Sequence, residues 1–315
     1  MTFRHWIATR LARAASPPPA QTIAYPIGGG ARSSTSTAHP NGHFYSPVVD
    51  TAELRPRIDE LWPAAPRVAG IDFNDVLHED ILRVSFAQFM PDYDYPEVLP
   101  ESAAPSAFFT QNSQFSWLDA RAFFVLLRRW RPRRLIEIGS GFSTLLAADV
   151  NRRFLDGQLD ITCIEPYPRE FLTRGVPGVS RLLQAKVQDI DLAEFDRLQS
   201  GDVLFIDSSH VAKTGSDVNF IYFEILPRLA AGVRIHIHDI FLPHEYPKDW
   251  VLDDNRSWNE QYLVRALLMN SSRYVVEFGS SYAFQQFPQQ VRDGLSLPGG
   301  RGFGGGSLWI RVRER

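Results

Sequence analysis

From residue 133 onward, apolar runs alternate with amphipathic stretches, and this alternation restricts the fold more than any other feature of the chain. The short apolar runs predict buried strands, at residues 135–138, 161–164, 203–206, 233–237, 274–278 and 308–312. Longer stretches between them predict helices, at residues 144–154, 218–229 and 258–269. Strands that alternate with helices indicate βαβ units, so we expect an α/β fold with a mostly parallel sheet and helices on both faces.

The residues before this region predict two further segments. Residues 1–35 contain arginines but no acidic residue, together with a proline triplet and a glycine triplet, and we expect a poorly ordered tail. A short basic amphipathic helix that binds a membrane surface, or a transit segment, is the alternative for this tail. Residues 36–115 are rich in aromatic residues and proline, and we interpret them as an N-terminal cap on the substrate side. Residues 116–315 form the main domain, which begins with a helix over 116–130 that Pro132 ends.

Charge and cysteine content exclude several classes of function. The chain has 33 Lys and Arg against 36 Asp and Glu, a net charge of −3, which gives no general attraction to nucleic acid or anionic lipid. Cys163 is the only cysteine, so an intrachain disulfide is excluded and a reducing, cytoplasmic location is expected. No apolar run approaches the roughly 20 residues of a membrane-spanning helix. The oligomeric state is left open.

A glycine-containing loop directly follows the first predicted strand, with the sequence EIGSGFST over residues 137–144. Glycines at this place allow a tight turn and the close approach of a ligand, and the next helix offers free backbone N–H groups. A dinucleotide fingerprint would have a third glycine where this chain has Thr144. Glu137 is unusual in a buried strand, because a buried carboxylate needs partners. It either accepts hydrogen bonds from a ligand or holds the loop in place.

An acidic residue ends the second predicted strand. In such folds the end of the second strand lies beside the glycine loop, where Glu165 can accept both hydroxyls of a ribose. The alternative is a surface acid that caps the next turn.

The EIGSG sequence at 137–141, Glu165 and the FID sequence at 205–207 resemble three motifs of class I S-adenosylmethionine-dependent methyltransferases, over about residues 110–280. This resemblance implies a Rossmann-like, doubly wound, mostly parallel seven-stranded sheet and S-adenosyl-L-methionine as the cofactor. The loop has Ser143 where a third glycine is common, and this GSGFST form resembles a subgroup of small-molecule and sugar O-methyltransferases.

The resemblance also implies which residues bind the cofactor. The methionine part would be held by Glu137, Gly139, Ser140 and Gly141, and the ribose by Glu165. The adenine would lie against Gln188 and Asp189.

Acidic residues and histidines follow the next two strands. Asp207 and His210 come after the strand at 203–206, and His238 and Asp239 come after the strand at 233–237. Carboxyl ends of neighbouring parallel strands meet at one edge, so these side chains can converge there. Carboxylate oxygens suit Mg²⁺ or Mn²⁺, and a histidine-rich set suits Zn²⁺ or Fe²⁺.

This arrangement resembles metal-assisted sugar and macrolide-sugar O-methyltransferases and, in outline, catechol-type enzymes. The resemblance implies that Asp207 and Asp239 bind a divalent cation such as Mg²⁺ and that His210 is the general base. Catechol-type enzymes have an Asn beside the second Asp, where this chain has Ile240. The third metal ligand is therefore unassigned, with His238 as the candidate. Without a metal, Asp207 would contact substrate or cofactor.

The sequence thus predicts an enzyme that methylates a hydroxyl of a small-molecule or saccharide acceptor, with no nucleic-acid partner. Three alternatives stay open. They are an NAD-dependent oxidoreductase, a metal-dependent hydrolase that uses the His/Asp cluster, and a non-catalytic binding protein.

Overall fold

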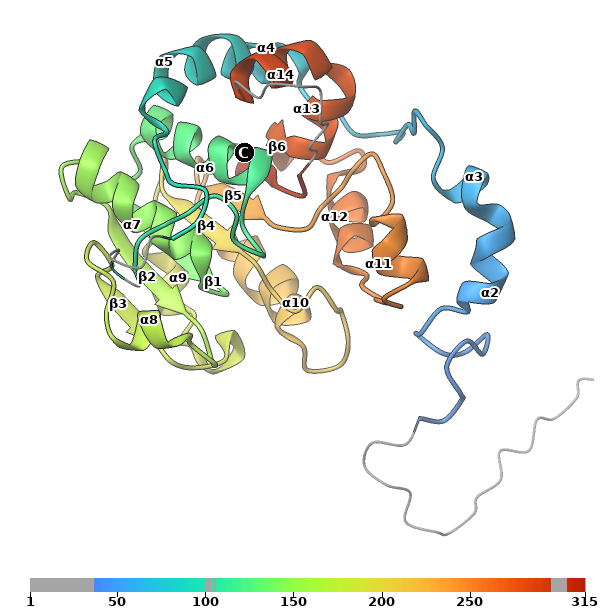
Figure 1. Cartoon of the computed structure of the whole chain (residues 1–315). Helices are drawn as coiled ribbons and strands as arrows, with labels where there is room; N and C mark the ends of the chain where they lie inside the picture. The colour runs from blue at the N-terminus through green and yellow to red at the C-terminus, as the bar shows by residue number, and fades with distance from the viewer. Residues whose placement is uncertain (1–36, 100–103, 105, 296–304, 315) are drawn as a thin grey trace, which may run out of the picture. The chain divides into compact units, whose positions relative to one another are not determined.

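The computed structural model describes residues 37–99, 104, 106–295 and 305–314. The chain divides into two compact units, Met1–Pro40 and Asn41–Arg315. The tail predicted at residues 1–35 lies outside the described residues. All helices and strands that the structure describes belong to the second unit (Figure 1). Of the helices that the structure describes, none combines the length and apolarity needed to cross a bilayer.

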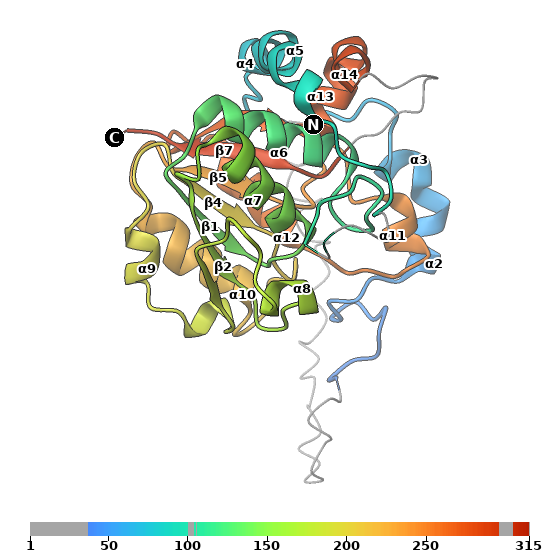
Figure 2. The ribbon, with the colours of Figure 1, turned by 60° about the vertical axis from the view of Figure 1, so that its left-hand side comes forward.

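Within the described residues, the second unit is built on a seven-stranded sheet with the order β3-β2-β1-β4-β5-β7-β6. The strands are β1 Arg134–Ile138, β2 Asp160–Ile164, β3 Arg181–Leu183, β4 Val203–Ile206, β5 Arg234–Ile237, β6 Tyr274–Gly279 and β7 Leu308–Val312. Strands β1 to β5 pair in parallel, and β7 pairs antiparallel with both β5 and β6 (Figure 2). The predicted mostly parallel sheet is therefore confirmed.

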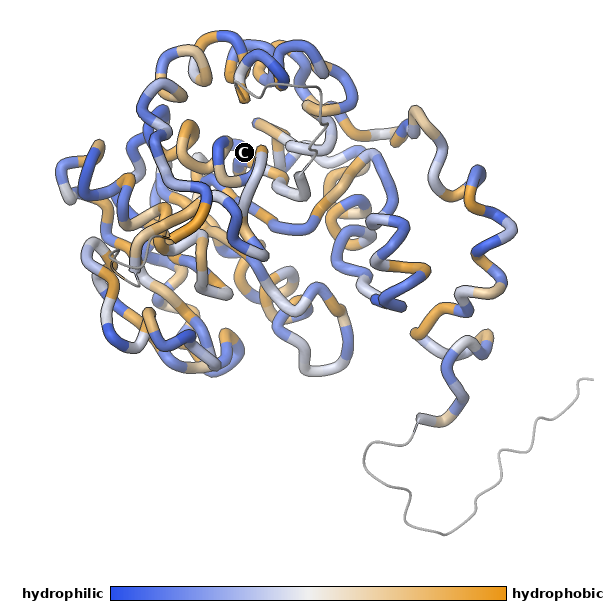
Figure 3. The backbone as a smooth tube through the Cα atoms, viewed as in Figure 1, coloured by the Kyte–Doolittle hydropathy of each residue, from blue (hydrophilic) through white to orange (hydrophobic). Residues whose placement is uncertain are grey.

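Helices cover both faces of this sheet. Helix α6 (Trp117–Trp130) and helix α7 (Phe142–Phe154) cover one face, and α10 (Asp217–Phe220) and α12 (Glu260–Leu268) lie on the other (Figure 2). Side chains of β4 alternate between two buried clusters, because successive strand residues point to opposite faces. Val203 and Phe205 belong to the buried cluster on the face of α6 and α7. Leu204 and Ile206 belong to the cluster on the opposite face. In Figure 3 the strands at the centre are mostly hydrophobic and the outer loops mostly hydrophilic.

The predicted helices form, with bounds that differ by a few residues. Helix α6 ends where Arg131 adopts a left-handed conformation before Pro132. The predicted helix 218–229 is α10 continued by a π-helical turn, Ile221–Ile225, and a 3-10 turn, Leu226–Arg228. Helix α12 begins two residues later than expected, after Asn259. Strand β3 was not identified from the residue pattern, because three half-buried residues give too short an apolar run.

Helices from the described residues between 41 and 99 lie against two parts of the main domain. Helices α2 (Thr51–Leu54) and α3 (Ile58–Leu61) lie near α11 (Lys248–Leu252), where Arg55 Nη2 donates to the Leu252 carbonyl at 2.7 Å. The continuous helical run α4 (Asp75–Asp80), η2 (Ile81–Phe86) and α5 (Ala87–Phe89) packs near α13 (Ser280–Gln286) and α14 (Pro288–Leu295). The remaining short helices are η1 Arg55–Arg57, η3 Met90–Asp92, α8 Glu170–Thr173, η4 Val187–Asp189 and α9 Ala193–Asp196.

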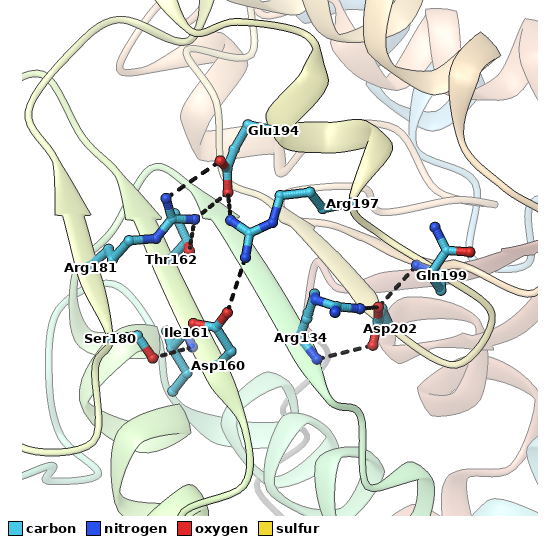
Figure 4. Close-up of polar contacts among 10 residues, drawn as sticks. All are labelled: Arg134, Asp160, Ile161, Thr162, Ser180, Arg181, Glu194, Arg197, Gln199 and Asp202. Atoms are coloured by element: carbon cyan, nitrogen blue, oxygen red, sulfur yellow. Dashed lines mark hydrogen bonds and ion pairs between the residues drawn. The ribbon is translucent and has the colours of Figure 1, made fainter.

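A polar network joins the amino ends of the strands (Figure 4). Glu194 accepts hydrogen bonds from Arg181 and Arg197, and Arg197 also pairs with Asp160 at 3.4 Å. Asp202 accepts the backbone N–H groups of Arg134 at 3.0 Å and Gln199 at 2.9 Å. This network is at the edge of the sheet opposite to the carboxyl ends of the strands, so it holds the strands together at that edge.

Candidate active site

Two adjoining cavities open at the carboxyl edge of the sheet, where β1, β2, β4 and β5 end. The larger has a volume of about 660 Å³ and the smaller about 570 Å³. Gly139, Glu165 and Asp207 border both of them. The predicted glycine loop and two of the predicted strand-end acids therefore lie together, as parallel strands require.

The two glycines of the loop have different roles. Gly139 has a φ of +79°, and a Cβ there would lie 1.9 Å from the carbonyl oxygen of Asp207. Only glycine allows the end of β4 to pass this close. Gly141 is extended, at φ −168°, and a Cβ on it would meet nothing within 4 Å. The space beside Gly141 is therefore open to a ligand.

Glu137 lies behind the loop and is fully buried. Its carboxylate accepts hydrogen bonds from the hydroxyls of Ser143 at 2.6 Å and Thr144 at 2.5 Å. Burial raises the pKa of Glu137 to about 7, against the opposing effect of these hydroxyls. The Thr144 hydroxyl also accepts the Gly141 N–H at 3.0 Å, so Thr144 joins the loop to the first turn of α7. Glu137 thus holds the loop in place, and its predicted contact with the cofactor stays a prediction.

Glu165 lines both cavities. Its carboxylate accepts the backbone N–H of Ser140 at 3.2 Å and that of Tyr167 at 2.8 Å. Gln188 lines the smaller cavity, where its amide donates to the Gly215 carbonyl at 3.0 Å. Asp189, the other residue predicted to contact adenine, has an exposed side chain. The structure therefore brings Gln188 to the cavity that Glu165 borders.

A cluster of two carboxylates and an imidazole lies in the larger cavity. His210 Nε2 is 3.3 Å from Asp207 Oδ1 and 3.4 Å from Asp239 Oδ2. One ligand atom from each of the three residues lies within 4.8 Å of the others. His238 Nε2 is 3.7 Å from Asp239 Oδ1, and its Nδ1 has no hydrogen-bond partner among the described residues. The structure thus places His210, the predicted base, between the two carboxylates, and His238, the candidate third ligand, beside Asp239; both roles stay predictions.

Glu260, which the sequence did not identify as a site residue, contacts this cluster through His210. Its side chain is fully buried, and its Oε2 lies 2.9 Å from His210 Nδ1. The hydroxyl of Ser208 donates to the same oxygen at 2.9 Å. Glu260 is the first residue of α12, and an acid at a helix N-terminus is usually explained by the helix dipole. For that reason the sequence alone did not predict that Glu260 contacts the site.

The carboxylates determine the charge of His210. Burial lowers the pKa of His210, but its contacts with Asp207 and Glu260 and the charge of Asp239 outweigh this and raise it to about 10. The imidazole is therefore protonated at neutral pH when these carboxylates surround it without a bound cation. His210 and Asp239 both have positive φ, +59° and +55°, a strained conformation that is common at functional sites.

Aromatic side chains surround the cluster. The ring of Trp258 lies 4.4 Å from that of His210, and Arg256 lies over both Trp258 and Trp250. Phe115 packs beside His238 at 5.4 Å and comes from the segment before α6. Trp250 belongs to the short helix α11, whereas Phe115, Arg256 and Trp258 lie outside helices and strands. No local sequence pattern marks any of the four as part of the site.

The start of β7 supports Asp239. The Gly306 carbonyl accepts the N–H of Ile240 at 2.7 Å, and a Cβ on Gly306 would lie 2.9 Å from Asp239 Cα. Asp119 of α6 in turn accepts the N–H groups of Gly306 at 2.9 Å and Ser307 at 3.0 Å. Glycine is required at 306 because the backbone after β5 passes against it.

Comparison with known solved structures gives weak likenesses. One is the O-methyltransferase TomG from Streptomyces achromogenes, involved in tomaymycin synthesis and solved with S-adenosylmethionine: 16% identity, TM-score 0.38, covering 77% of this chain and 97% of that one. Another is an O-methyltransferase from Bacillus cereus in complex with S-adenosylhomocysteine: 15% identity, TM-score 0.36, covering 83% and 97%.

Comparison of the sequence is more informative. An uncharacterised protein from Archaeoglobus fulgidus is 38% identical over 167 residues, which are 51% of this chain and 73% of that protein. Residues 136–240 match the model of a family described as a methyltransferase domain. This range runs from β1 to just beyond β5, so it includes the glycine loop, Glu165, Asp207 and Asp239. The match and the observed seven-stranded fold show that the chain belongs to the class I S-adenosylmethionine-dependent methyltransferases.

Proposed function

We propose that this methyltransferase acts on a hydroxyl oxygen of a small-molecule or sugar acceptor. The observation that carries the proposal is the place of His210, which lies between Asp207 and Asp239 in the same cavity as the glycine loop. A hydroxyl holds its proton tightly, so its methylation benefits from a proton acceptor beside the methyl donor. The family assignment favours methyl transfer over the hydride transfer and hydrolysis that the sequence had left open.

The cofactor would occupy both cavities. Glu165 borders each cavity and would accept the ribose hydroxyls. Adenine would enter the smaller cavity, beside the buried Ile164 and Val187 and near Gln188. The methionine part would lie along Gly139, Ser140 and Gly141, which leaves the sulfonium methyl on the side of His210.

Methyl transfer is a displacement at the sulfonium methyl carbon. The acceptor oxygen forms a bond to this carbon while the carbon–sulfur bond breaks, and neutral S-adenosylhomocysteine leaves. The hydroxyl proton passes to His210 Nε2. Positioning of the two reactants supplies much of the rate acceleration, and His210 can accept the proton only as the neutral imidazole.

A divalent cation bound to the two carboxylates would be consistent with a neutral imidazole at His210. Asp207 and Asp239 present hard carboxylate oxygens within reach of one another, which fits Mg²⁺ or Mn²⁺. Bound there, the cation would lower the pKa of an acceptor hydroxyl. With both carboxylates engaged by a cation, the imidazole of His210 would keep Glu260 at Nδ1, and its Nε2 would be free to accept a proton.

The cofactor site is tested by calorimetric titration with S-adenosylhomocysteine. We expect Glu165→Ala to weaken binding about 10-fold or more, because a hydrogen-bonded charged group contributes roughly 1.5–3 kcal/mol. Glu170→Ala is the matched control, since Glu170 is an exposed carboxylate on nearby α8 that pairs with Arg174. A folded wild-type protein that does not bind S-adenosylhomocysteine would contradict the proposal.

The role of His210 is tested with His210→Ala. We expect kcat to fall by about 10²- to 10⁴-fold, the usual contribution of a general base, while affinity for S-adenosylhomocysteine is unchanged. Removal of divalent cations with EDTA should abolish turnover, and Mg²⁺ should restore it. If His210→Ala also loses the cation, His210 is a metal ligand and not the base. Unchanged turnover would remove it from both roles.

A further inference from the structure

We propose that Glu260 is a positioning residue for the reaction, which orients the imidazole of His210 through the hydrogen bond at Nδ1. This inference rests on the proposed function, because it takes His210 Nε2 to be the atom that faces the reacting groups. Glu260 itself is fully buried and does not line the cavity, so it acts on the reaction through the ring of His210.

The hydrogen bonds of Glu260 are directed at His210. Its Oε2 lies 2.9 Å from His210 Nδ1 and accepts the Ser208 hydroxyl at 2.9 Å. Its other oxygen, Oε1, forms no hydrogen bond of good geometry within the described part of the chain, although the buried Tyr222 hydroxyl is close enough for Glu260 to raise the pKa of Tyr222. A buried carboxylate with an unsatisfied oxygen lowers stability, so packing alone does not account for a glutamate at this position.

The backbone of the same helix start holds the main chain of His210. The N–H groups of Asn259 and Glu260 donate to the His210 carbonyl at 3.0 and 3.2 Å. The ring of Trp258 packs at 4.4 Å from the imidazole. The beginning of α12 therefore fixes the backbone, one ring nitrogen and the ring plane of His210. A hydrogen bond at Nδ1 sets which nitrogen carries the proton and leaves Nε2 directed toward Asp207 and Asp239.

Activity measurements separate positioning from a purely structural role. We expect Glu260→Ala to lower kcat about 10- to 100-fold, the range found for residues that orient a functional histidine. The KM values should stay within about threefold, because the substrate contacts are retained. Glu260→Gln should recover much of the loss, since its amide oxygen can still accept the Nδ1–H.

Glu277→Ala is the matched control. Glu277 is a buried carboxylate too, but it pairs with Arg234 and Arg311, and Arg234 begins the strand whose far end leads to Asp239. This substitution should lower the free energy of unfolding and leave kcat of the folded protein unchanged. An equal loss of kcat in both variants, or an unchanged kcat in Glu260→Ala, would overturn the proposal.

A second readout does not depend on any acceptor. In a ¹⁵N-edited NMR spectrum of the histidine rings, the Nδ1–H of His210 should appear as a slowly exchanging proton, assigned by its loss in His210→Asn. Glu260→Ala should lose this signal and Glu260→Gln should keep it. Persistence of the signal in Glu260→Ala overturns the inference. If the spectra behave as expected but the wild type methylates no hydroxyl, the proposed O-methylation fails while the positioning contact stands.

Discussion

Gly139 shows how little freedom a single residue of the site has. The end of β4 passes so close that any side chain would strike the Asp207 carbonyl, and the positive φ adds strain for every other residue. At Gly141, two residues later, a side chain would strike no neighbouring atom, and φ is not positive. The loop therefore contains one glycine required by the fold and one that leaves space beside the cavity.

This difference predicts opposite outcomes for two similar substitutions. Gly139→Ala should lower the free energy of unfolding by about 1–3 kcal/mol or more, because the loop and the end of β4 must separate. Gly141→Ala should change it by less than about 1 kcal/mol. Urea denaturation of both variants checks this. Equal losses would mean that the close approach at Gly139 does not determine stability.

The predictability of individual site residues follows from where they lie. Glu165, Asp207 and Asp239 come at the ends of parallel strands, so the sheet pattern alone brings them to one edge. Glu260 and Trp258 come from the segment after β5, and their place depends on how α12 packs beneath the cluster. No local pattern in the sequence encodes that packing.

At the scale of elements, Glu137 joins strand β1 to helix α7 through the hydroxyls of Ser143 and Thr144. Burial raises its pKa from the ordinary value of 4.5 to about 7 in the folded state. The folded protein therefore binds this proton more tightly than the unfolded chain, and the contribution of Glu137 to stability decreases as pH rises from 4.5 to 7.

We predict that Glu137→Gln removes this pH dependence. The full shift corresponds to a difference on the order of 3 kcal/mol between the ends of the window. The free energy of unfolding of wild type, minus that of the variant, should therefore decrease as pH rises through the window. Urea unfolding at a series of pH values measures it. A difference that does not change with pH would contradict the raised pKa.

Element types were predicted well where the apolar pattern is long. The six strands expected from the sequence all form, but β3 has only three half-buried residues and no periodicity to reveal it. The π-helical turns in η2 and η5 also left no signal, because their apolar spacing is close to that of an ordinary helix.

For the molecule as a whole, the boundary of the folded unit lies near residue 41. Among the described residues, the buried hydrophobic core begins at Phe73 and continues to Val312. Stability and cofactor binding should therefore depend on the second unit. The sequence pattern predicted the sheet but not the place of β7, because chain order does not state that the last strand enters between β5 and β6.

Removal of residues 1–40 tests this boundary. We expect the shortened chain to have a free energy of unfolding within about 0.5 kcal/mol of the full chain, the usual limit for changes outside a core. Its affinity for S-adenosylhomocysteine should also be unchanged. Denaturation and calorimetry of the two proteins give the comparison, and a clear loss in either would place part of the first unit in the fold.

The position of β7 also bears on how the protein is made. While the ribosome is still adding residues before 305, strand β5 has no neighbour on one side and presents unpaired backbone groups there. The N–H groups that Asp119 binds and the glycine that lies against Asp239 have not yet been synthesised. The nascent chain therefore carries an open sheet edge until almost all of the described fold exists. Translation that stops early would yield a product prone to association through β5.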